Sequence, residues 1–155
     1  MAQTGDGGAE VYVFGNSLVH HLGDEAHSNV PYWLAQMADA GGRELSLEGQ
    51  WGFLRDFAGG LPPRPNWSFP EVSGFWDPGR GSFADSGVDA VLITPANFIQ
   101  YQLPDVPYDG DNPDGESPLG ALQRLFDWVE VNSADTRLFI YEGWSDMASF
   151  SRGFP

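Results

Sequence analysis

The sequence predicts one α/β domain built on a mostly parallel β-sheet. Strand-like and helix-like segments alternate along the 155-residue chain, which favours parallel strands joined by right-handed crossover helices. The clearest strand, residues 88–94, is almost continuously apolar, as is typical of a parallel strand buried on both faces. A chain of this length corresponds to one domain, which we assign to residues 10–155, after a tail at 1–9 that we expect to be disordered.

The first half of the chain predicts two strand–helix units. Residues 11–14 are apolar and run into a Gly-Asn-Ser turn at 15–17, which ends the first strand. Residues 32–40 follow a proline, carry apolar side chains at helical spacing and stop at two glycines, so they predict a helix. Polar and apolar residues alternate over 43–48, which predicts a second strand, and residues 51–57 predict a short helix.

The second half predicts a strand, a helix and a last strand, separated by long loops. Residues 61–87 are rich in proline and glycine and contain several aromatic side chains. A loop of this length in a compact domain is usually functional or packs over something. After the strand at 88–94 and a second loop at 101–118, apolar residues at helical spacing predict a helix over 119–131. The last strand covers residues 136–142.

The composition excludes several classes of partner and site. Seven Lys and Arg residues stand against 22 Asp and Glu residues, and the resulting formal charge of −15 repels nucleic acid and anionic membranes. No apolar run approaches the roughly 20 residues of a membrane-spanning helix. Cysteine is absent, which excludes disulfides and thiolate nucleophiles. The oligomeric state stays open, and the Ala-Gln-Thr start, similar to the remainder of a cleaved export signal, slightly favours a periplasmic or secreted location over a cytoplasmic one.

Residues of chemical interest follow the predicted strands. Ser17 follows the first strand, Gly49 the second and Asn97 the third, and Trp144 comes just after the last strand. The carboxyl ends of parallel strands open on one edge of the sheet, where open α/β sheets bind their ligands. A serine on a glycine turn at such an edge is a common way to present a nucleophile, whereas an ordinary Ser or Asx turn is the alternative for this stretch alone.

Taken together, these residues resemble the SGNH hydrolases, also called GDSL-type esterases and lipases. The family is named after a Ser, a Gly, an Asn and a His from four sequence blocks. Three blocks have counterparts here: Phe-Gly-Asn-Ser-Leu-Val at 14–19, Leu-Glu-Gly-Gln-Trp-Gly at 47–52 and Thr-Pro-Ala-Asn-Phe at 94–98. In the first block Asn16 stands where the family usually has Asp, and in the third Pro95 and Phe98 replace the usual Gly and Asp.

The resemblance implies a flavodoxin-like α/β/α fold and the hydrolysis of acyl esters without a cofactor. Ser17 is the implied nucleophile. The implied oxyanion hole consists of the backbone N–H groups of Ser17 and Gly49 and the side-chain amide of Asn97, with Gly52 competing for the role of Gly49. Loss of one such donor typically raises the barrier by roughly 2.7–4 kcal/mol.

The family's last block, Asp-x-x-His, is missing, because no histidine occurs after His27. A serine hydroxyl needs a base, usually an oriented imidazole. We favour the explanation that the 155 residues are the N-terminal portion of a longer domain, since four strands are predicted where the resemblance leads us to expect five. In the alternative, His20, His21 or His27 acts as the base. The 155-residue chain itself is expected to be inactive or weakly active.

Aromatic residues at the same edge indicate a substrate class. We expect Asn16, Trp51 and Trp144 to contact substrate, and exposed tryptophans suit an acylated carbohydrate. A non-catalytic carbohydrate-binding module on the same fold is the alternative function. Four tryptophans lie in predicted loops or at strand ends, where they can line a substrate cleft: Trp51, Trp67, Trp76 and Trp144. Two lie on predicted amphipathic helices and are expected in the core: Trp33 and Trp128.

Two polar segments have the composition of metal sites. Residues 109–116 combine carboxylates and glycines as calcium loops do, but the EF-hand pattern fails and an acidic turn is the favoured interpretation. His20 and His21 precede Asp24 and His27 at a spacing that can bind zinc, although a polar loop is favoured there too. We therefore expect no metal site.

Overall fold

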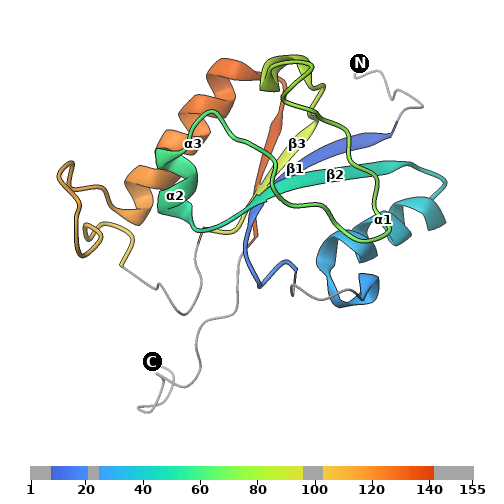
Figure 1. Ribbon diagram of the computed structural model, residues 1–155, viewed down its shortest axis with the longest axis horizontal. Helices are drawn as coiled ribbons and strands as arrows, with labels where there is room; N and C mark the ends of the chain where they lie inside the picture. The colour runs from blue at the N-terminus through green and yellow to red at the C-terminus, as the bar shows by residue number, and fades with distance from the viewer. Residues whose placement is uncertain (1–7, 21–24, 96–102, 142–155) are drawn as a thin grey trace, which may run out of the picture.

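The computed structural model describes residues 8–20, 25–95 and 103–141. These form an all-parallel sheet of order β2-β1-β3-β4 with helices on both faces (Figure 1). The arrangement is a flavodoxin-like α/β fold, which confirms the predicted fold class. The strands are β1 (Ala9–Gly15), β2 (Leu45–Trp51), β3 (Ala90–Ile93) and β4 (Arg137–Ile140). The helices are α1 (Val30–Ala40), α2 (Leu54–Gly59) and α3 (Pro118–Asn132), with short 3-10 helices at Ala26–Ser28 and Phe83–Asp85.

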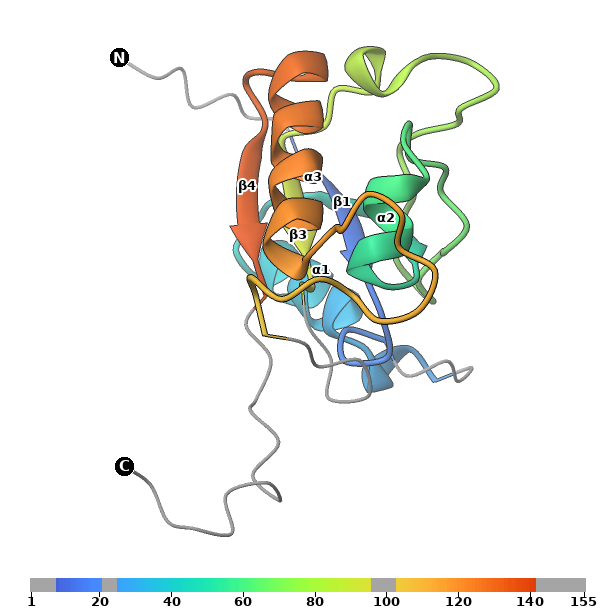
Figure 2. The same cartoon turned by 90° about the vertical axis from the view of Figure 1, so that its left-hand side faces the viewer.

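The three α-helices are divided between the two faces of the sheet. Helix α1 covers the face that carries Val13 and Leu47, whereas α2 and α3 pack together on the opposite face (Figure 2). Successive side chains of a strand point to opposite faces, so Tyr12 and Phe14 point towards α2 and α3 while Val13 points towards α1. Strand β1 is therefore buried on both sides. None of the described helices is long and apolar enough to span a membrane.

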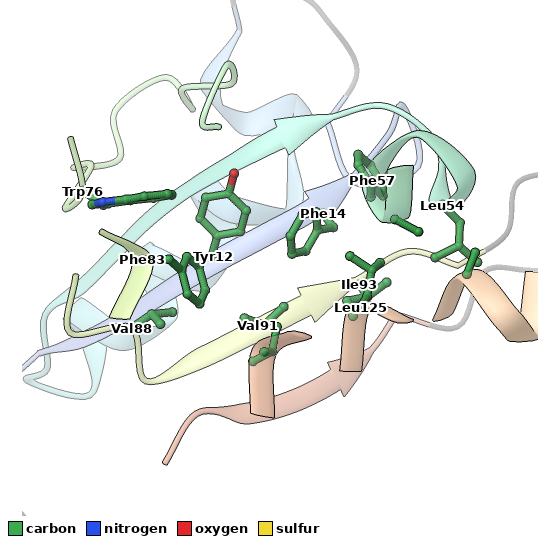
Figure 3. Close-up of a cluster of buried hydrophobic side chains, with 13 residues drawn as sticks. Tyr12, Phe14, Leu54, Phe57, Trp76, Phe83, Val88, Val91, Ile93 and Leu125 are labelled. Atoms are coloured by element: carbon green, nitrogen blue, oxygen red, sulfur yellow. The ribbon is translucent and has the colours of Figure 1, made fainter. Parts of the chain in front are cut away.

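The larger core lies between the sheet and helices α2 and α3, and it is built around aromatic rings (Figure 3). Tyr12 contacts Trp76 and Phe83 edge to face, with ring centroids 5.7 Å apart in both pairs. Phe14 packs against Phe57 at 5.2 Å. Because Trp76 is buried in this core, the expectation that it lines a substrate cleft is wrong.

The loop over residues 61–87 covers the outer edge of β2. The N–H of Leu47 donates to the carbonyl of Ser73 at 2.9 Å, and Gly49 pairs with Trp67 through an antiparallel bridge. An uncovered strand edge invites pairing with other chains, so this loop protects β2. Trp67 is buried in the second core, on the α1 face, which contradicts its expected place in a cleft.

Helix α1 begins two residues earlier than predicted, because Asn29 caps it. The Asn29 side-chain oxygen accepts a hydrogen bond from the backbone N–H of Tyr32 at 2.7 Å. Leu34 packs on the α1-face core, but Trp33 is 53% exposed, so its expected burial is wrong. One helix on one sheet face can bury only one stripe of side chains, and Trp33 lies outside that stripe. Trp128 packs against the larger core as expected.

Candidate functional site

The strand order creates a topological switch point between β1 and β3. From β1 the chain crosses through α1 to β2, and it then passes to β3 on the other side of β1. In open α/β sheets, ligands bind in the crevice outside the carboxyl ends of the strands at such a point. Ser17 follows the end of β1 and Thr94 follows the end of β3, and the Thr94 N–H donates to the Phe14 carbonyl at 2.8 Å. The residues after β1 and β3 therefore emerge side by side.

A tight turn after β1 presents Ser17. The Asn16 carbonyl accepts hydrogen bonds from the N–H groups of Val19 at 2.9 Å and His20 at 3.2 Å, and the Asn16 side-chain oxygen accepts from the Leu18 N–H at 3.0 Å. Asn16 is only 2% exposed, so it builds the turn and is not on the surface where we expected it to meet substrate. Ser17 is exposed, and neither its N–H nor its hydroxyl bonds to any residue in the described part of the chain.

His20 is a buried structural residue in this arrangement. Its ring packs against Trp67 and Phe69, and its Nδ1 accepts a hydrogen bond from the indole N–H of Trp67 at 2.8 Å. Because Nδ1 accepts, the imidazole is neutral and carries its proton on Nε2. Such a ring does not have the free nitrogen that a base towards Ser17 needs. His27 is exposed and lies 3.3 Å from the Glu25 carboxylate, and His21 lies outside the described residues.

Gly49 does not end a strand, in contrast to the sequence-based expectation. It lies inside β2, level with Val13 of β1, and its N–H donates to the Trp67 carbonyl at 3.3 Å on the far side of β2. That N–H therefore points away from β1 and does not face Ser17. A Cβ at Gly49 would overlap the Val13 carbonyl, so the close approach of two strands requires glycine here.

The end of β2 closes onto the end of β1. The N–H of Gly52 donates to the Gly15 carbonyl at 2.9 Å, so this second candidate donor is also engaged. The side-chain oxygen of Asn66 accepts from the Trp51 N–H at 2.9 Å and fixes the last residue of the strand. The Trp51 ring packs edge to face on Phe53 and remains 37% exposed. It is an aromatic surface beside the switch point.

Thr94 is a residue of this edge that the sequence analysis missed. It is 1% exposed, and its hydroxyl has no hydrogen-bond partner within residues 8–20, 25–95 and 103–141. The sequence signal was weak, because a threonine at the end of an apolar run is ordinary in a strand. Asn97 and Trp144, the remaining predicted site residues, lie outside the described residues.

The pKa shifts of two β1 side chains come from burial. Burial raises the pKa of Tyr12 well above its usual range, and the negative charge of Glu48 raises it further. Burial and the nearby Asp89 carboxylate raise the pKa of Glu10, at the opposite end of β1 from Ser17. These shifts reflect the packing of the sheet and do not mark a proton-transfer group beside Ser17.

The acidic segment after residue 108 is organised by one side chain. The Asn112 amide donates to the carbonyls of Tyr108 at 3.1 Å and Glu116 at 2.9 Å, and its oxygen accepts from the Glu116 N–H at 2.9 Å. Glu116 in turn pairs with Arg124 of α3 at 2.9 Å. In the described part of the chain, no group of three Asp, Glu or His side chains is placed to hold a metal ion.

Comparison with known proteins gives no relative from which to assign a role. No family model matches the chain, and neither a curated protein nor a solved structure matches it.

Proposed function

We propose that this chain belongs to a serine-dependent ester hydrolase of the SGNH type, with Ser17 as nucleophile. The observation that supports this most is the placement of Ser17, which is exposed on a tight turn at the switch point between β1 and β3. In the sequence, Asn97 comes four residues after Ile93, the last residue of the neighbouring strand β3. Paired strand ends are where convergent side chains can act on one substrate atom.

In the proposed reaction, the Ser17 hydroxyl attacks the ester carbonyl and a general base takes its proton. The oxygen of the tetrahedral intermediate is stabilised by the Ser17 N–H and the Asn97 amide. Gly49 and Gly52 are left out of this scheme, because their N–H groups bond to other carbonyls. The proposed base is an oriented imidazole, the role of the histidine in the Asp-x-x-His block of SGNH hydrolases.

We propose an acylated carbohydrate as the substrate class. The half-exposed Trp51 ring beside the switch point is suited to stacking against the apolar face of a sugar. The formal charge of −15 makes a neutral ligand a better partner than an anionic one.

A fluorophosphonate probe tests the proposed nucleophile. In the natural full-length protein, the probe should modify the peptide that contains Ser17, as read by mass spectrometry, and Ser17→Ala should abolish both labelling and p-nitrophenyl acetate turnover. Ser68→Ala is the matched control, because Ser68 is also exposed but lies in the loop along β2. Labelling that persists in Ser17→Ala would refute the proposal.

A non-catalytic carbohydrate-binding module is the second candidate. It is favoured by the engagement of both glycine donors together with the exposure of Trp51. This candidate predicts that an acetylated oligosaccharide binds the protein, that Trp51→Ala removes binding, and that Ser17→Ala leaves binding unchanged. Hydrolysis of the bound acetyl groups by the natural protein would exclude it.

A further inference from the structure

Thr94 occupies a buried position directly beside the Ser17 turn. The register of β1 and β3 pairs Phe14 with Ile93, and the next residue, Thr94, extends this ladder through its N–H bond to the Phe14 carbonyl. Thr94 therefore lies beside Gly15. Since Leu92 packs in the α1-face core, the side chain of Thr94 two residues later points to the same face.

The buried hydroxyl of Thr94 requires an explanation. It is fully enclosed and has no hydrogen-bond partner in the described part of the chain. A buried polar atom without a hydrogen-bond partner is unfavourable, and most buried polar atoms in proteins have one. Valine has nearly the same shape and would fill this position without an unpaired oxygen. A hydroxyl kept here at the switch point is better explained by function than by packing.

The neighbouring Asn16 has complementary hydrogen-bonding capacity. Its side-chain oxygen accepts from the Leu18 N–H, which leaves the NH₂ group on the other side of the amide as a potential donor. Asn16 is 2% exposed and comes directly after Gly15, beside which Thr94 lies. In this structure the Thr94 hydroxyl and this NH₂ group are not bonded to each other, so a hydrogen bond between them requires a small shift of the turn.

We propose that Thr94 is a positioning residue, whose hydroxyl pairs with the Asn16 amide and holds the Ser17 turn against β3 when a substrate binds. This role rests on the proposed function of Ser17. In this role, Asn16 and Thr94 together orient the nucleophile from the buried side of the turn, and neither side chain touches the substrate.

The test compares Thr94→Val with Thr94→Ser in the natural full-length protein. Thr94→Val keeps the volume and removes the hydroxyl, and we expect the rate of Ser17 labelling and kcat for p-nitrophenyl acetate to fall about tenfold with KM unchanged. Thr94→Ser keeps the hydroxyl and should stay within about twofold of the wild-type rate. The urea midpoint of Thr94→Val should not fall, because the substitution removes an unpaired buried oxygen.

Three results would overturn the role of Thr94. They are a wild-type rate in Thr94→Val, an equal loss in Thr94→Ser, and a loss confined to KM. If Thr94→Val does not fold, Thr94→Ala replaces it, with the same expected tenfold loss relative to Thr94→Ser and the same contrary results. Absence of Ser17 labelling in the wild-type protein would instead overturn the proposed function, and the role of Thr94 with it.

Discussion

Replacing Gly49 by alanine tests whether the close approach of β1 and β2 requires glycine at this position. A Cβ built at Gly49 would overlap the Val13 carbonyl oxygen and lie 3.1 Å from the Val13 Cβ. Normal carbon contacts lie at roughly 3.5–4.0 Å, so β1 and β2 must move apart by roughly 0.5–1 Å. That movement stretches the hydrogen bonds between the first two strands of the sheet.

The expected loss in the free energy of unfolding is about 2–4 kcal/mol. Overpacking contributes about 1–3 kcal/mol, and each weakened backbone hydrogen bond adds up to about 1 kcal/mol. Urea unfolding followed by far-ultraviolet circular dichroism measures this loss. With a slope of about 1–3 kcal/mol per molar urea, a loss of 3 kcal/mol lowers the midpoint by about 1–3 M.

Gly59→Ala is the matched control for the same chemical change. A Cβ at Gly59 meets no atom within 4 Å, and Gly59 is the last residue of α2. Alanine there should raise the unfolding free energy by about 0.5–1 kcal/mol. If Gly49→Ala unfolds at the same urea concentration as the wild type, or as Gly59→Ala, the steric explanation is refuted.

Three further substitutions address buried polar groups. Tyr12→Phe should be at least as stable as the wild type at pH 7, because the Tyr12 hydroxyl has no hydrogen-bond partner in the described part of the chain. Folding raises the pKa of Tyr12 above its unfolded value near 10, so the free energy of unfolding of the wild type should fall by about 1.4 kcal/mol per pH unit above pH 10. Urea unfolding at pH 7–11 should show a shallower fall for Tyr12→Phe. Equal dependence of the unfolding free energy on pH in the two proteins would contradict this. Trp67→Phe removes the hydrogen-bond donor to His20 and should lower the unfolding free energy by about 1–3 kcal/mol. Its control, Trp33→Phe at an exposed position, should change the unfolding free energy by less than about 0.5 kcal/mol. Similar losses in the two variants would show that the buried hydrogen bond is unimportant. Asn29→Ala should lower the unfolding free energy by about 1 kcal/mol through loss of the α1 cap, and Asn29→Ser should restore most of that loss in the same urea assay. A Ser variant that is no more stable than the Ala variant would argue against capping.

The fold class was predictable because its signals are local. Each strand and helix has its own periodicity, and the alternation of the two element types predicts parallel strands. The strand order was not predictable in this way. Which strands become neighbours depends on contacts between distant segments, such as the pairing of β1 with β3, and no local pattern encodes them.

The site was predictable only in part, for reasons visible at single residues. The turn that carries Ser17 was predictable, because a glycine turn after an apolar strand is a local signal. Gly49 was misplaced, because glycine marks turns and close strand contacts alike. Trp67 was expected on the surface of a loop, but its hydrogen bond to His20 draws it into the α1-face core. Thr94 has no local mark at all, since its interest comes only from its burial beside β1.

The central position of β1 has a consequence for how the chain folds. The Glu10 N–H bonds to the Asp89 carboxylate at 2.9 Å across a sequence separation of 79 residues. At a synthesis rate of about 5–20 residues per second, that separation corresponds to roughly 4–16 s in which β1 lacks its second neighbour. During this interval an apolar strand edge of the nascent chain is exposed to chaperones and to other chains. The turn that carries Ser17 is synthesised well before β3, the strand that pairs with β1 on this side in the folded protein.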